Sequence, residues 1–141
     1  MPPADRYVFV YGTLRRGEER DINRLHPAPE YVGKASMTGR LFDLGTYPGL
    51  VLGGEGAVQG EVYRISAALE RLLDEIEEVW PQQTGEYAKR EVKVDLAAAE
   101  AGDALYLSMQ CLVYEIAIAR TTGHTCIESG DWVKYRICKA G

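Results

Sequence analysis

Short apolar runs separated by glycine-rich connections recur along this chain, and their spacing constrains the fold more than any other feature. The runs lie at residues 7–11, 37–44, 50–52, 58–65, 91–96 and 105–116. Their length and their β-branched and aromatic content are typical of strands. The glycines at 45–49 and 53–56 are interpreted as turns between them. Many short strands at this spacing favour a closed or nearly closed sheet.

Size and charge limit the classes of function. The 141 residues, 46% of them hydrophobic, fit one domain spanning residues 1–141 with a sizeable core. The net charge of −5 gives no broad attraction to nucleic acid or to an anionic membrane surface. No apolar stretch approaches the ~20 residues that cross a bilayer, and the first residues contain no signal-peptide core. We therefore expect a cytoplasmic protein with no nucleic-acid or membrane partner; no motif specifies an oligomeric state.

The cysteines and histidines provide no framework for a disulfide or a metal ion. Cys111, Cys126 and Cys138 are odd in number and lack the C-x-x-C spacing, so reduced thiols are expected. His124 lies close to Cys126 in the sequence, but two ligands do not make a zinc site. We expect no metal site.

One amphipathic helix is predicted after Ser66, which can cap it. Its apolar stripe consists of Leu69, Leu72, Leu73 and Ile76, and the helix is expected to end at Trp80–Pro81. Glu77 lies at the edge of the stripe, where partial burial would raise its pKa and suit it to proton transfer. The alternative is a solvated glutamate at the rim of the helix. Asp74 is interpreted as an ordinary surface carboxylate.

The first apolar run ends abruptly in Tyr11, Gly12, Thr13 and Leu14. Gly12 allows a sharp turn or a close approach to a ligand. The following residues, Thr13 to Arg15, can present consecutive backbone N–H groups to an anion or oxyanion. The alternative is a plain strand followed by a glycine turn. Asp131 is interpreted as part of a turn, with Trp132 packing on the sheet.

An ordered set of motifs covers nearly the whole chain. In order, these are residues 11–17, 39–49, 58–63 and 73–77, Tyr87 with residues 89–94, residues 113–114, and residues 129–132. Together they resemble the γ-glutamylcyclotransferase-like family, with its strand-end Tyr-Gly-Ser/Thr-Leu loop, its Leu-Asp-x-x-Glu helix and, at residues 113–114 and 129–132, its last strands. The chain departs from the family at Glu78, where members usually carry glycine, and in a longer stretch at residues 80–86.

The resemblance implies an α+β fold, a small mixed β-barrel with short peripheral helices. It assigns the general acid/base role to Glu77 and substrate binding to Tyr11, Gly12, Thr13 and Leu14. Pocket walls are expected from Tyr47, Tyr87 and Tyr114. The family reaction is intramolecular attack by the α-amine of a small γ-glutamyl substrate, which releases 5-oxoproline without a cofactor. The loop N–H groups could bind the oxyanion or the α-carboxylate. The alternative function is a non-catalytic small-molecule-binding module on the same fold.

Overall fold

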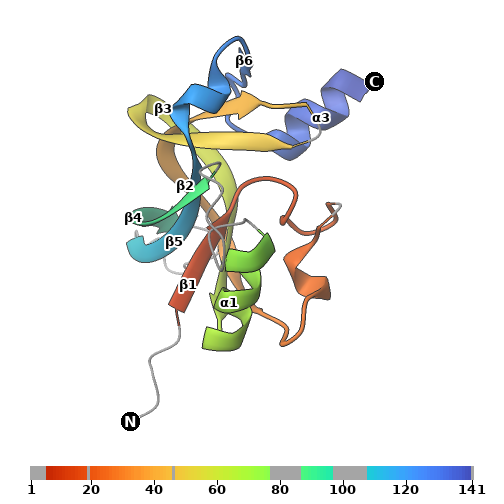
Figure 1. The fold of residues 1–141 in the computed structure, drawn as a ribbon, viewed down its shortest axis with the longest axis vertical. Coiled ribbons are helices and arrows are strands. Elements are labelled where there is room, and N and C mark those ends of the chain that lie inside the picture. The colour runs from red at the N-terminus through yellow and green to blue at the C-terminus, as the bar shows by residue number, and fades with distance from the viewer. Residues whose placement is uncertain (1–5, 19, 46, 77–86, 97–107, 141) are drawn as a thin grey trace.

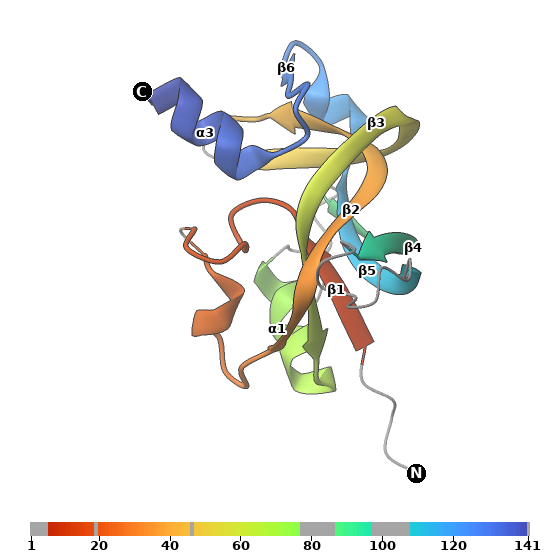
Figure 2. The same ribbon diagram turned by 180° about the vertical axis from the view of Figure 1, so that it is seen from behind.

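Five strands close into a mixed barrel in the structure, a computed structural model that describes residues 6–18, 20–45, 47–76, 87–96 and 108–140 (Figures 1 and 2). The strands are β1 (Arg6–Val10), β2 (Glu30–Asp43), β3 (Pro48–Ile65), β4 (Tyr87–Leu96) and β5 (Ser108–Ile116). Around the barrel the order is β3, β1, β5, β4 and β2, and pairing of β2 with β3 completes the circle. The β1–β5 pair is parallel and the others are antiparallel. The predicted fold class is confirmed.

Strand β1 is buried on both faces, which explains its unbroken apolar sequence. Successive strand residues point to opposite faces. Phe9 faces the barrel interior, where it packs with Val58, Val62 and Val113. Val8 and Val10 belong to a second cluster with α1 (Ala67–Ile76). The strand is therefore a shared wall of both clusters.

Helix α1 begins as predicted. The Leu69 N–H donates to Ser66 Oγ at 3.2 Å, and Leu69 and Leu73 are fully buried against the barrel. The last described helical residue is Ile76, so Glu77 and the expected helix end at Trp80–Pro81 lie outside the described residues. No described helix is long and apolar enough to span a membrane.

The predicted turn at residues 53–56 is wrong, because β3 runs through it as one bulged strand. Gly39 pairs with Leu52 and Thr38 with Ala57, so residues 53–56 of β3 have no partners on β2. Gly53 and Gly54 provide the left-handed backbone there, with φ of +91° and +85°. The hairpin bends at this bulge, and its tip lies beside α3 (Trp132–Ala140) (Figures 1 and 2).

Residues 129–132 do not form a strand, so the strand expected there from the family resemblance is wrong. Asp131 Oδ1 accepts from the Lys134 N–H at 3.1 Å, which makes Asp131 the N-cap of α3. Trp132 is buried in the barrel core, as expected. The remaining elements are the 3-10 helices η1 (Ile22–Arg24) and η2 (Ile118–Thr121), and β6 (Thr125–Cys126), which pairs with the end of β2.

Candidate functional site

The loop after β1 presents more donors than acceptors. Its carbonyl oxygens accept hydrogen bonds from later backbone N–H groups: Arg15 to Gly12 (3.0 Å), Arg20 to Thr13 (2.9 Å) and Ile22 to Leu14 (2.9 Å). By contrast, no acceptor among the described residues is found for the N–H groups of Gly12, Thr13 and Leu14. The expectation that the Arg15 N–H is also available is wrong, because that group closes the turn onto Gly12. Within the described residues these three adjacent N–H groups are therefore the backbone donors of the loop that remain without an acceptor.

Gly12 is required by a contact within the protein. A Cβ atom at this position would lie 2.6 Å from Pro48 Cγ and 2.8 Å from Pro48 Cδ. The structure shows a close approach of Gly12 to Pro48, at the start of β3, and the approach to a ligand stays a prediction. Through this contact the Gly12–Leu14 loop lies against the β2–β3 turn.

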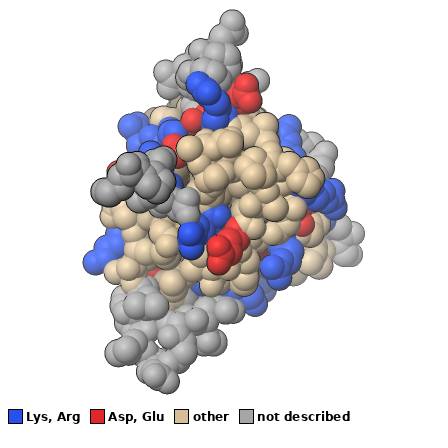
Figure 3. Space-filling model, turned by 90° about the horizontal axis from the view of Figure 1, so that it is seen from below, with Lys and Arg blue, Asp and Glu red and all other residues tan. Residues whose placement is uncertain are grey.

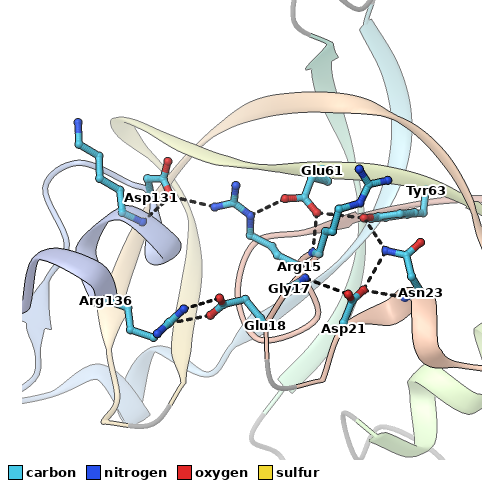
Figure 4. A network of polar contacts seen from close by, with 11 residues as sticks. Arg15, Gly17, Glu18, Asp21, Asn23, Glu61, Tyr63, Asp131 and Arg136 are labelled. Atoms are coloured by element: carbon cyan, nitrogen blue, oxygen red, sulfur yellow. Dashed lines mark hydrogen bonds and ion pairs between the residues drawn. The ribbon is translucent and has the colours of Figure 1, made fainter. Parts of the chain in front are cut away.

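Arg15 joins the loop to the barrel and to α3 (Figure 4). Its guanidinium donates to Glu61 Oε2 at 2.8 Å and to Asp131 Oδ1 at 2.9 Å, and its side chain is only 12% exposed. Burial lowers the pKa of Arg15, but hydrogen bonds and charge from Glu61 and Asp131 outweigh it and leave the pKa raised. Glu61 also accepts from the Arg16 N–H and the Tyr63 hydroxyl. Arg15 therefore stays charged, and its role is structural.

Asp21 fixes the far end of the same loop (Figure 4). Its carboxylate accepts from the N–H of Gly17 at 2.9 Å, and from the N–H and Nδ2 of Asn23 at 2.9 and 2.8 Å. Burial raises the pKa of Asp21, but these hydrogen bonds outweigh burial and lower it overall. Asn23 Nδ2 also donates to the Tyr63 hydroxyl at 3.2 Å, and burial raises the pKa of Tyr63 to about 12.

All four predicted tyrosines lie near the Pro48 end of β3, Tyr114 through its backbone carbonyl. The Tyr11 hydroxyl donates to the Tyr114 carbonyl at 2.7 Å and accepts from the Leu50 N–H at 3.3 Å. The Tyr87 hydroxyl donates to the Pro48 carbonyl at 3.2 Å. The fourth, Tyr47, is half-buried in the turn immediately before Pro48.

Asp74 is not the ordinary surface carboxylate expected from the sequence. It accepts from the Tyr114 hydroxyl at 2.7 Å and from Lys89 Nζ at 2.9 Å, and its side chain is 15% exposed. Lys89 also donates to Glu70 at 2.7 Å. Burial lowers the pKa of Lys89, but the two carboxylates outweigh it and raise the pKa overall.

A hollow of about 250 Å³ lies over this cluster, lined by Ala67, Glu70, Arg71 and Asp74. On the face seen in Figure 3, the end of the barrel where α1 lies, basic groups surround a largely uncharged centre and acidic groups lie beside some of them. Glu77 follows this last described turn of α1 in the sequence.

The described residues contain no group of three or more histidine, cysteine, aspartate or glutamate side chains able to hold a metal ion. His124 Nδ1 lies 3.1 Å from the Asp43 carbonyl oxygen. All three cysteines are free, and burial raises the pKa of the Cys111 thiol to about 12.

This barrel, with a loop at the end of β1 and α1 packed outside β1, is the architecture of γ-glutamylcyclotransferase-like proteins. A solved structure of an AIG2-like protein from mouse superposes with a TM-score of 0.72 at 28% identity, covering 92% of this chain and 90% of that one. The family model described as gamma-glutamyl cyclotransferase, AIG2-like, matches residues 8–134. The chain belongs to this family.

Two relatives show how far the similarity extends. The gamma-glutamylcyclotransferase family protein YtfP of Escherichia coli strain K12 is 33% identical over 127 residues, which covers 89% of this chain and 95% of the relative. The gamma-L-glutamyl-butirosin B gamma-glutamyl cyclotransferase of Niallia circulans is 43% identical over 72 residues, covering 50% of this chain and 45% of that protein.

Proposed function

We propose that the protein is a γ-glutamyl cyclotransferase that releases 5-oxoproline from a small γ-glutamyl amine or peptide. The observation that carries the proposal is the Gly12–Leu14 loop, whose carbonyls are engaged within the chain while its N–H groups find no acceptor among the described residues. Acyl transfer requires such donors where negative charge develops on the carbonyl oxygen. Family membership and the name of the relative from Niallia circulans support the same reaction class.

The reaction needs one proton carrier. The α-amine nitrogen of the substrate attacks its own γ-carbonyl carbon, which forms the ring C–N bond and places negative charge on the oxygen. Collapse of this intermediate breaks the bond to the leaving amine. Glu77 accepts a proton from the attacking nitrogen and returns one to the leaving nitrogen, so the enzyme ends the cycle unchanged.

The N–H groups of Gly12, Thr13 and Leu14 act either on the oxyanion or on the substrate α-carboxylate. Tyr47, Tyr87 and Tyr114 form walls that hold the flexible glutamyl chain in a curled attack geometry. Tyr11 supports these walls, because its hydroxyl ties the Tyr114 carbonyl to the Leu50 N–H.

The test is incubation of the purified protein with γ-glutamyl amines, γ-glutamyl dipeptides and glutathione, with 5-oxoproline as the measured product. Glu77→Gln preserves side-chain volume and should lower turnover by roughly 10²–10⁴-fold, the usual contribution of general acid–base catalysis. Glu75→Gln is the matched control, because this substitution makes the same chemical change at an exposed position of α1.

Two outcomes contradict the proposal. A fully active Glu77→Gln variant would remove the proton carrier from the mechanism. Tight binding of γ-glutamyl compounds by the wild-type protein, with no 5-oxoproline from any of them, would favour the non-catalytic binding module.

A γ-glutamyl analogue without its α-carboxylate separates the two uses of the loop, since only carboxylate binding predicts a large rise in KM.

A further inference from the structure

Helix α3 contacts two segments that are far apart in the sequence and that both flank the candidate site. Arg136 makes a bidentate ion pair with Glu18, from Nε to Oε1 at 2.9 Å and from Nη2 to Oε2 at 2.7 Å. The Tyr135 hydroxyl donates to Asp43 Oδ2 at 2.7 Å. At its N-cap, Asp131 accepts from Arg15. Figures 1 and 2 show α3 beside the hairpin tip, and Figure 4 shows its contact with the β1 loop.

Both segments that α3 contacts are connected to the Gly12–Leu14 loop. Glu18 lies four residues after Leu14, in the segment whose backbone satisfies the loop carbonyls. Asp43 ends β2, and its Oδ1 accepts from the Gly45 N–H at 2.8 Å within the turn that delivers Pro48 against Gly12. A shift of either segment would therefore change where the Gly12–Leu14 N–H groups point.

The start of α3 is itself fixed to the barrel. Trp132 is 3% exposed within the barrel core. The Gln59 N–H donates to the Gly130 carbonyl at 2.7 Å, and Gly130, with φ of +67°, leaves no room for a Cβ beside the Ala57 carbonyl. The helix is therefore a support whose own position is set by β3.

We propose that Arg136 and Tyr135 are positioning residues, which act through Glu18 and Asp43 to hold the two segments at the site. This inference rests on the proposed function for its kinetic consequence. The Glu18 side chain is 5% exposed and that of Arg136 is 47% exposed. Loss of Arg136 leaves a buried carboxylate without its counter-charge, so Glu18 must move toward water and carry the loop with it. Loss of the Tyr135 hydroxyl removes one donor from buried Asp43 and loosens the turn.

The variants Arg136→Gln and Tyr135→Phe test the two contacts separately. Lys134→Gln is the control, because it removes the same charge from an exposed position of α3. Backbone hydrogen exchange is followed at Gly17 and Arg20 for the loop, at Leu44 and Gly45 for the turn, and along β5 for the barrel. The kinetics of 5-oxoproline release are measured on the same samples.

We expect a crossed pattern of local opening. Arg136→Gln accelerates exchange about tenfold at Gly17 and Arg20 but leaves Leu44 and Gly45 unchanged, and Tyr135→Phe does the reverse. Exchange along β5 stays at the wild-type rate. Each variant lowers kcat/KM about 10- to 100-fold, because displaced N–H groups no longer meet the oxyanion or the α-carboxylate of the substrate. Lys134→Gln behaves as wild type.

Wild-type exchange at the loop in Arg136→Gln, or equal acceleration of every amide including β5, would overturn the inference. So would a crossed exchange pattern with unchanged kcat/KM in an active enzyme. If the wild-type protein releases no 5-oxoproline, the proposed function fails. The exchange pattern then still decides whether α3 holds the two segments.

Discussion

Replacing Arg15 by methionine tests whether the polar network beneath the loop stabilises the fold. The change keeps the length and apolar part of the side chain and removes its charge. The change removes the counter-charge of Glu61, whose side chain is 10% exposed. It also removes one partner of Asp131, whose side chain is 26% exposed. Breaking a buried ion pair by removing one partner costs about 3–5 kcal/mol. Glu61 keeps the Arg16 N–H and the Tyr63 hydroxyl as donors, so we expect a loss of about 2–3 kcal/mol.

The free energy of unfolding is measured by urea denaturation for Arg15→Met, Glu61→Gln and the double variant. Because the two side chains are in direct contact, the double variant should cost about 1–3 kcal/mol less than the sum of the single variants. Arg90→Met is the matched control, since Arg90 pairs with Glu115 at 3.2 Å with its own side chain 55% exposed. That change should cost less than about 1 kcal/mol. A loss at Arg15 no larger than at Arg90, or strict additivity, would refute the reasoning.

Three further perturbations follow from particular contacts. Gly130→Ala should cost about 2–4 kcal/mol in urea denaturation, because its Cβ would lie 1.8 Å from the Ala57 carbonyl oxygen, whereas Gly17→Ala, at φ of +83° in open space, should cost only about 1–2 kcal/mol; equal losses would contradict this reading. The lowered pKa of Asp21 means that its stabilisation is present above the unfolded pKa of about 3.9 and is lost as pH falls through the folded pKa. Asp21→Asn should therefore be less stable than wild type at pH 7, with a difference that shrinks as pH falls below about 3.9 in unfolding measurements, and a constant difference would argue against the pKa shift. Cyclotransferase activity should survive EDTA, since a carboxylate, backbone donors and tyrosines form no ligand set for a divalent ion; loss with chelator and recovery with zinc would contradict this.

Local signals in the sequence were sufficient for the parts of the fold that local physics decides. Ser66 caps α1 because a hydroxyl before an apolar stripe satisfies a free helix N–H, whatever the rest of the chain does. The run at β1 was recognisable because both of its faces are buried. Closure into a barrel followed from the number and spacing of such runs.

Features that depend on distant partners could not be predicted in this way. The bulge at residues 53–56 is defined by its register against Thr38 and Gly39, so the glycines alone looked like a turn. The partners of Arg15 lie 46 and 116 residues away. Asp74 looked like a surface residue because its partner Tyr114 comes from β5, 40 residues further along the chain.

Helix α3 was not expected because its sequence has no continuous apolar stripe. Trp132 is buried while Ile137 is 59% exposed. The local signal that could have identified it is Asp131, a favoured N-cap residue immediately before the helix.

The parallel β1–β5 pair also determines when the molecule can fold during synthesis. Strand β1 leaves the ribosome first, but one of its two neighbours, β5, is made after β2, β3 and β4. Strand β4 likewise depends on β5 for its longest pairing. A nascent chain that ends before Ser108 therefore holds the long β2–β3 hairpin with β1 beside it, and exposes open strand edges on β1 and β4. Completion of the barrel therefore waits for β5, and the chain that lacks β5 is the form that needs protection from aggregation.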